Sequence, residues 1–177
     1  MVNEAKIKTA MVDPAPAVAT PRELLDQVTQ FIYCEARLAD NHEYDAWEAL
    51  WTDDAIYWIP ANGEGGDPEN QMSIVYDNRS RIALRIKQFH TGKRHSQTPK
   101  SRLCRIISNI EILQVDEKQI QACANAMVFE SSTRGDTIWA SRNAYTLHRD
   151  GDGLRMSLKK VVLANNDRAL YSMSFLI

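Results

Sequence analysis

The chain has 177 residues, of which 44% are hydrophobic and 25% are charged, and these are ordinary values for one globular domain. The formal net charge of -2 gives no electrostatic case for binding nucleic acid or an anionic membrane surface. No run approaches the roughly 20 apolar residues that a membrane span needs, so we expect partners that are neither nucleic acid nor membrane.

The first 20 residues are rich in Ala, Val and Pro and show no periodicity. Asp13, Pro14 and Pro16 interrupt any secretory apolar region, so we expect no export. Residues 1–20 are therefore predicted to be a flexible arm, either free or draped over a partner subunit, and residues 21–177 a single domain. We predict that the three cysteines are small buried thiols in a protein of a reducing compartment, the cytoplasm. They are Cys34, Cys104 and Cys123.

A capping box predicts the start of the first helix, with Thr20 at the N-cap, Pro21 at the first helical position and Glu23 reaching back. Apolar residues recur at helical spacing after it: Leu24, Val28, Phe31 and Leu38. Glu35 falls on the same apolar face. A carboxylate in that position needs a cationic or donor partner, because an unpaired buried charge is costly.

A second helix is predicted after a break at Asp40, which we expect to cap it. Its apolar stripe consists of Tyr44, Trp47, Leu50 and Trp51. Asp53 and Asp54 then lead into a strand at 56–59, and the Gly- and Asp-rich residues 61–71 form a loop.

A third helix is predicted over residues 74–89, with Thr91 and Gly92 ending it. Apolar residues at positions 75, 82, 86 and 89 alternate with Arg79, Arg81 and Arg85, which gives this helix a basic face. We expect Arg81 and Arg85 to lie at the surface.

From Arg102 onward the apolar period changes from helical to two. The first strand ends at a turn over 116–118, and later strands are predicted at 120–128, 139–147, 154–163 and 169–177. Helices followed by an antiparallel meander predict an α+β fold in which a curved sheet wraps the helices.

This pattern resembles the β (small) subunit of aromatic-ring-hydroxylating dioxygenases, the Rieske-type non-haem iron oxygenases. The residues that carry the resemblance are Glu35, Ala36, Arg37, Leu38, Asp40, Tyr44, Trp47, Asp53, Asp54, Tyr57, Pro60, Tyr76, Asp77, Asn78, Arg79, Pro99, Ser101, Arg102, Arg105, Ser108, Asn109 and Arg142. The resemblance covers about residues 22–177 and implies a cone-shaped fold of the nuclear-transport-factor-2-like type. Departures at 93–96 and 141–144 leave the subgroup and the aromatic substrate open.

The resemblance also implies a division of labour between subunits. An α subunit would hold a Rieske iron–sulfur cluster and a mononuclear iron and would carry out cis-dihydroxylation of an aromatic substrate. Electrons would come from NAD(P)H through a reductase, often via a ferredoxin. This chain would be a non-catalytic subunit that assembles with α, as three of each, or as a β trimer when isolated.

Charged and polar residues within the resemblance are predicted to hold the cone geometry and the subunit contacts, and the other interpretation is a set of solvated surface charges. They are Glu35, Arg37, Asp40, Tyr76, Asp77, Arg79, Arg102, Arg105, Asn109 and Arg142.

We expect no cofactor in this chain. A Rieske cluster needs Cys-x-His and Cys-x-x-His, and no cysteine here is followed by histidine at those positions. His90 and His95 could be taken for an iron site, but their spacing turns the two rings apart on a helix. The residues between the two histidines are polar and basic and are typical of a turn, so a surface loop is the favoured interpretation.

The alternative function is a stand-alone lyase or isomerase of the same cone fold, dehydratase- or ketosteroid-isomerase-like, with an acid–base site in its cavity. Burial would raise the pKa of one carboxylate so that it acts as a base. The candidates are Asp40, Tyr44, Tyr57 and His148. The structural interpretation of the same residues is a helix cap, two packed aromatic rings and a strand end. A small-molecule binding module would share the pocket and lack the acid–base pair.

Overall fold

The computed structural model describes residues 21–92, 97–151 and 153–177. The predicted arm at 1–20, including the Thr20 cap, lies outside the described residues, as does His95. The elements in chain order are α2 (Arg22–Asp40), α3 (Tyr44–Ala49), β1 (Trp51–Pro60), β2 (Ser73–Asn78), α4 (Arg79–His90), β3 (Arg102–Val115), β4 (Gln119–Ser132), β5 (Gly135–Asp150) and β6 (Gly153–Leu163).

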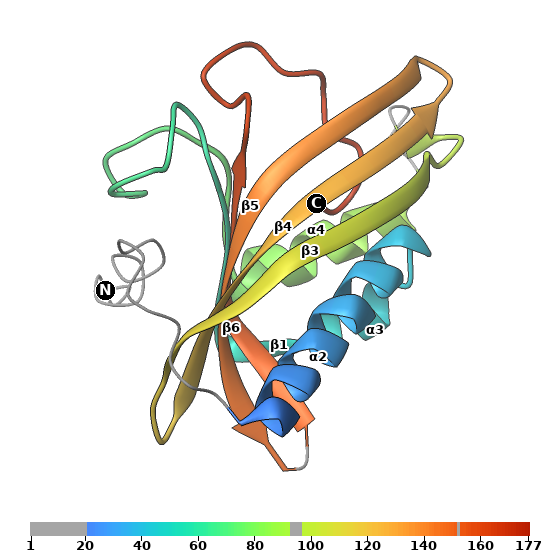
Figure 1. Ribbon diagram of the computed structural model, residues 1–177. Coiled ribbons are helices and arrows are strands. Elements are labelled where there is room, and N and C mark those ends of the chain that lie inside the picture. Colours follow the sequence, from blue (N-terminus) through green and yellow to red (C-terminus); the bar gives the residue numbers. More distant parts are fainter. Residues whose placement is uncertain (1–20, 93–96, 152) are drawn as a thin grey trace.

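The strands form one six-stranded sheet in the order β2-β1-β6-β5-β4-β3. Figure 1 shows this sheet as strongly twisted and curved, with the three helices packed against its inner face. Strands β3 to β6 form an antiparallel meander, and β1 pairs with β6 in parallel. The α+β prediction, with N-terminal helices packed in a curved sheet, is confirmed.

Helix α2 forms where the apolar spacing predicts it. Leu24, Val28, Phe31 and Leu38 are buried on one face, and Glu35 is buried with them. The helix begins at Arg22 rather than at Pro21, because Pro21 has an extended backbone with a ψ of 131°.

The boundary between the second helix and the first strand differs from the prediction. Asp40 does not cap α3; it is the last residue of α2, and Glu43 occupies the N-cap of α3. Trp51 belongs to β1 rather than to the helical stripe, so Asp53 lies inside the strand. A tryptophan suits either element, and here its ring packs between Trp47 and Tyr57, at centroid distances of 5.2 and 5.9 Å.

The helix predicted over 74–89 is wrong in its first part, because residues Ser73–Asn78 form strand β2 and pair antiparallel with β1. Helix α4 starts only at Arg79, where the Asn78 side chain accepts a hydrogen bond from the Arg81 backbone N–H at 3.1 Å. This cap was missed because the short apolar run before it fits both periods. The predicted end near Thr91 is confirmed.

The strand predicted over 169–177 is also wrong, since this segment joins no ladder of the sheet. Its last residues instead insert into the core, where Phe175, Leu176 and Ile177 are buried. The Tyr57 hydroxyl donates to the Ile177 carbonyl at 2.8 Å and accepts from the Ile177 N–H at 3.1 Å. The backbone groups of Ile177 are therefore satisfied by a side chain rather than by a neighbouring strand.

Two further features of the meander matter below. The pairing of β3 with β4 shifts register between Ser108 and Glu111, where Asn109 has a left-handed backbone with a φ of 52°. Cys104 is exposed on β3, so the prediction of a buried thiol is wrong there, and Cys34 and Cys123 are only partly buried. Among the described residues, none of the helices is long and apolar enough to cross a membrane.

Candidate functional site

The interior of the cone contains a buried ion pair between α2 and β6. The Lys159 ammonium lies 2.7 Å from Glu35 Oε1, and both residues are 1% exposed. Trp47 Nε1 donates to the same carboxylate at 2.6 Å. Burial lowers the pKa of Lys159, and the Glu35 carboxylate opposes that shift. The sequence predicts that Glu35 needs a partner, and the structure gives it two: the Lys159 ammonium from β6 and the Trp47 indole N–H from α3.

A second pair ties the edge of the sheet to α2 and to the C-terminal segment. The Asp40 carboxylate accepts hydrogen bonds from the Arg105 guanidinium and from its backbone N–H, and the latter distance is 2.8 Å. The same guanidinium donates to the Leu176 carbonyl, and the Arg105 side chain is only 3% exposed. Arg105 therefore holds three parts of the cone together.

Two buried tyrosines, Tyr57 and Tyr145, also belong to this polar interior. Ser141 donates to Asn143 at 2.8 Å, and the Asn143 amide donates to the Tyr145 hydroxyl at 3.2 Å. Burial raises the pKa of Tyr57 and of Tyr145 above the ordinary tyrosine value. Among the described residues, Trp51 Nε1 alone is a buried side-chain polar atom without a hydrogen-bond partner. Apart from Trp51 Nε1, the buried polar side chains of the described interior are therefore satisfied.

The structure does not bring the proposed acid–base residues together, because each has a different partner. Asp40 binds Arg105, and Tyr57 binds Ile177. The Tyr44 hydroxyl lies 2.9 Å from His42 Nδ1, and burial raises the pKa of Tyr44 to about 12. His148 Nε2 lies 2.7 Å from the buried Ser157 hydroxyl. The one carboxylate of this set, Asp40, is engaged by Arg105 instead of being free to act as a base.

The described residues also do not suit a metal. Within 21–92, 97–151 and 153–177 there is no group of three or more His, Cys, Asp or Glu side chains placed to share an ion. His90 is engaged with Asp45 at 2.8 Å. The donor set needed for a two-histidine, one-carboxylate iron site is therefore not assembled among them.

The predicted interface residues divide into three groups. Glu35, Asp40 and Arg105 belong to the interior pairs just described. A second group pairs along the helices and the β2 edge, and the N···O or O···O distances are 2.6 Å for Asp77–Arg85, 2.6 Å for Arg79–Glu48 and 2.9 Å for Tyr76–Glu69. The exposed group contains Arg37, Arg102, Asn109 and Arg142.

Sequence reasoning missed Lys159 and misplaced Arg85. Arg85 is half-buried and paired with Asp77 instead of lying free at the surface, whereas Arg81 is exposed as predicted. A signal for Lys159 was available, because it lies in phase with Val161 and Leu163, which face the core. A lysine at a core position of an alternating strand predicts a buried acidic partner.

The outer face of the sheet carries exposed apolar side chains. Two cross-strand rows run over β3, β4 and β5, and we call their residues the outer patch: Cys104, Phe129 and Ile138 in one row, and Ile106, Met127 and Ala140 in the next. Ile106 is 64% exposed and Ile138 is 60% exposed. Beside the patch lies a hollow of about 770 Å³ that contains Arg142 and is bordered by Glu64 and Asp167.

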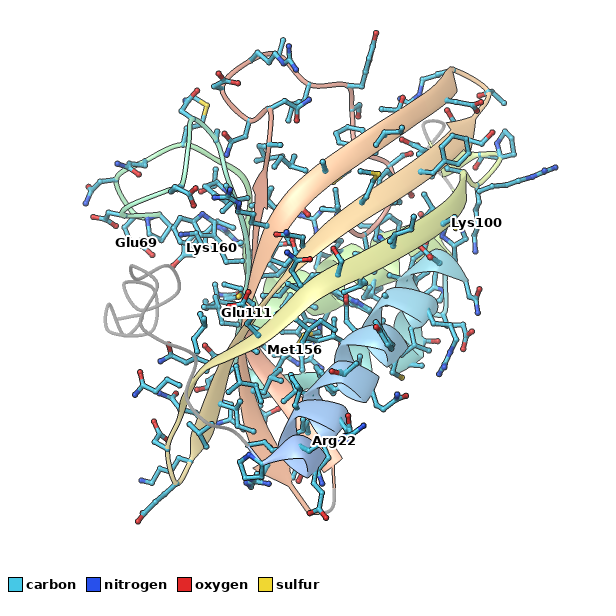
Figure 2. The ribbon with its side chains drawn as sticks, in the orientation of Figure 1. Arg22, Glu69, Lys100, Glu111, Met156 and Lys160 are labelled. Carbon is cyan, nitrogen blue, oxygen red and sulfur yellow. The ribbon has the colours of Figure 1, made fainter. Side chains whose placement is uncertain are left out.

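The loop between β1 and β2 folds over the same outer face. Lys160 lies 4.4 Å from the Trp58 ring centroid and donates to the Gly65 carbonyl at 3.3 Å. Figure 2 shows Lys160 beside the loop that carries Glu69, on the side of the sheet away from α2. A Cβ at Gly65 would lie 2.7 Å from the Trp58 ring, so only glycine permits this close approach.

Comparisons with known proteins bear on these features. The family described as "Ring hydroxylating beta subunit" matches residues 34–167. The chain is 30% identical to the 2-halobenzoate 1,2-dioxygenase small subunit of Burkholderia cepacia, over 78% of this chain and 87% of that protein. It is also 30% identical to the anthranilate 1,2-dioxygenase small subunit of Acinetobacter baylyi, over 81% of this chain and 91% of that protein.

The fold has a counterpart among solved structures. The β subunit of the benzoate 1,2-dioxygenase from Burkholderia mallei superposes with a TM-score of 0.70 at 24% sequence identity. The match covers 80% of this chain and 91% of that chain. The predicted cone-shaped fold therefore agrees with a β subunit whose structure is known.

Proposed function

This chain belongs to the family of β subunits of ring-hydroxylating dioxygenases, and from that premise we propose that it is a structural subunit with no chemistry of its own. The observation that carries the proposal is the pairing of the buried charges, in which Glu35 and Lys159 form an ion pair within the chain. A cavity enzyme needs a free acid or base, whereas a scaffold needs rigidity.

In the proposed complex, α subunits hold the Rieske cluster and the mononuclear iron and carry out cis-dihydroxylation. Three α and three β subunits assemble in the cytoplasm, and a reductase, often with a ferredoxin, delivers electrons to α. The described residues of this chain offer no donor set for either iron centre, which supports placing both centres in α.

The predicted interface residues then have two separate roles. Glu35, Asp40, Asp77 and Arg105 fix the cone, since their side chains are mostly buried and paired within the chain. The exposed group, Arg37, Arg102, Asn109 and Arg142, is available for contacts between subunits.

The substrate of the complex is proposed to be an aromatic carboxylic acid. Support comes from the relatives, which are named for 2-halobenzoate, anthranilate and benzoate. Turnover of benzoate compared with benzene by the assembled complex tests this point, and a preference for benzene contradicts it.

The main experiment is co-expression of the full chain with its α subunit, followed by native mass spectrometry and aromatic turnover, with each chain alone as control. We expect a mixed complex that is active only when α is present. Arg102→Ala is expected to weaken assembly while leaving the turnover of each assembled complex unchanged. A chain that remains separate from α and converts a small molecule by itself would overturn the proposal.

A further inference from the structure

A cavity of about 670 Å³ lies at the end of the cone where the loop between β1 and β2 and the segment after β6 project together (Figure 1). Its walls come from β1, β2, α4 and the segment 166–176. A volume of this size is typical of sites that bind small organic molecules. The assembly role proposed above makes no use of this cavity.

One side of the cavity is an apolar surface. Tyr57 and Ile59 contribute to it from β1, and Phe175 and Leu176 contribute from the C-terminal segment. These four side chains are between 0% and 5% exposed, so the packed core holds them in place. Such a surface suits a ring or an alkyl chain, because burial of apolar surface against it is favourable.

Arg85 contributes a cation to the same cavity. Its Nε donates to Asp77 Oδ2 at 2.6 Å, and within the described residues this is the only hydrogen bond that the guanidinium makes. The two Nη groups are not sealed off, since among the described residues only Trp51 Nε1 is a buried side-chain polar atom without a partner. The contact with Asp77 therefore orients the guanidinium and leaves its Nη groups free for a second acceptor.

The charge around Arg85 favours an anion with a matching shape. The other charged residues that line the cavity are Asp167 and Arg168, and both are exposed. Burial raises the pKa of Tyr57, and the Arg85 charge opposes that shift, so the guanidinium acts on the apolar wall as well. Because Asp77 already balances part of this charge, a ligand has to fit the planar fork of the guanidinium as well as be negative.

We propose that this cavity binds a small monocarboxylate with an apolar body. The carboxylate accepts hydrogen bonds from the Nη groups of Arg85, and the body packs against Tyr57, Ile59 and Phe175. A carboxylate offers the guanidinium two charged oxygens, whereas a neutral amide offers one uncharged oxygen. The inference goes beyond the assembly role and does not depend on it, since this chain alone supplies every residue of the site.

The test measures binding to the full-length chain by isothermal titration calorimetry, with 2-naphthoate as the probe and 2-naphthamide as its neutral counterpart. The wild type should prefer the acid by about tenfold or more. Arg85→Gln should weaken the binding of 2-naphthoate by about 10- to 100-fold and leave the affinity for the amide little changed. Arg81→Gln is the matched control, because Arg81 lies one turn earlier on α4, is exposed and does not line the cavity.

Two further measurements protect the test against a variant that folds poorly. Circular dichroism should show a native unfolding transition for Arg85→Gln, in which the new amide can still donate to Asp77. Arg85→Lys keeps the positive charge beside Asp77 but loses the fork, so it should still reduce the preference for the acid over the amide. A residue with a purely structural role would change both affinities together and leave this preference unchanged.

Methionine methyl groups report where the probe binds. Met173 lines the cavity, whereas Met127 lies beside the hollow on the outer face of the sheet. In NMR spectra of chain labelled at its methionine methyl groups, 2-naphthoate should shift the signal of Met173 and leave that of Met127 in place. Octanoate provides a carboxylate with a chain instead of a ring, and the tighter of the two acids identifies the apolar body that the site prefers.

Three outcomes overturn the inference. A wild-type chain that binds neither acid at millimolar concentration has no such site. Equal affinities for 2-naphthoate and 2-naphthamide, unchanged in Arg85→Gln, would mean that Arg85 does not recognise a carboxylate. A shift of Met127 without a shift of Met173 would place the probe on the outer face. In contrast, a chain that binds the acid in the cavity and never assembles with α would contradict the proposed function and leave this inference standing.

Discussion

Charged side chains on the two faces of this sheet differ in burial and in pairing. On the inner face, Lys159 and Arg105 each meet a carboxylate from α2, and their side chains are 2% and 3% exposed. On the outer face, Arg142 is exposed beside apolar residues and makes no ion pair with the described residues. The inner charges are satisfied by the fold itself, and on the outer face Lys160 is covered by the loop between β1 and β2. Arg142, in contrast, can be satisfied by a partner. Substitutions should therefore separate folding from assembly.

The largest effect is expected for Glu35→Ala, which leaves Lys159 buried without a counter-charge and Trp47 Nε1 without an acceptor. The free energy of unfolding should fall by about 3–5 kcal/mol in urea titrations. Glu48→Ala is the control, since Glu48 is 22% exposed and pairs with the half-exposed Arg79. Its effect should stay below about 1 kcal/mol. Equal losses in the two variants would mean that burial does not decide how much an ion pair contributes to the free energy of unfolding.

Arg105→Ala should rank second. It removes the guanidinium from the Asp40 carboxylate and the Leu176 carbonyl, but the backbone N–H of residue 105 still donates to Asp40. Asp40 is also 18% exposed, so water can partly replace the guanidinium. We expect a loss of about 2–3 kcal/mol. Arg102→Ala, on the same strand but exposed, should change the unfolding free energy by less than about 0.5 kcal/mol. A larger loss for Arg102 than for Arg105 would contradict the assignment of these two arginines.

High pH should weaken the inner face next. Burial raises the pKa of Tyr57 and Tyr145 above the ordinary value of 10.0, so the folded chain keeps protons that the unfolded chain releases. The stabilisation is complete below pH 10 and is lost as the pH rises above it, by about 1.4 kcal/mol per pH unit for each tyrosine. Urea titrations between pH 9 and 11 measure this slope. Tyr145→Phe should roughly halve it, and an unchanged slope would show that Tyr145 ionises in the folded chain.

The smallest effect is expected on the outer face. Ile138→Thr keeps a β-branched side chain at a position that is 60% exposed, so the unfolding free energy should change by less than about 0.5 kcal/mol. Urea titrations measure this change. A loss above about 2 kcal/mol would mean that the outer patch supports folding.

The sequence predicts the elements whose period is unambiguous. The apolar face of α2, the meander from Arg102 to β6 and the need of Glu35 for a partner all follow from spacing. It does not predict which residue supplies that partner, because Lys159 lies 124 positions away and only the closed sheet brings it to α2. Pairing across such a distance is a property of topology rather than of local pattern.

Short segments were mispredicted for a related reason. Ser73–Asn78 is so short that a helical and an extended period fit it about equally well. The C-terminal segment 169–177 is mostly apolar, a composition that fits a buried irregular segment as well as a strand. Tertiary contacts decide both cases. Strand β2 pairs with β1 at the edge of the sheet. The C-terminal residues are held by Tyr57 and Arg105. Sequence analysis singled out these two residues but not the C-terminal segment that they bind.

The left-handed Asn109 has a consequence for the behaviour of the chain at high concentration. β3 is 14 residues long and lies at the edge of the sheet, where its free backbone groups could template the addition of a foreign strand. The irregularity at Asn109 interrupts the regular pairing of β3 with β4, so the edge is not one uniform stretch of 14 residues. A flat, regular edge of that length would favour cross-β aggregation, and we expect the irregularity to make the pairing of a foreign strand less favourable.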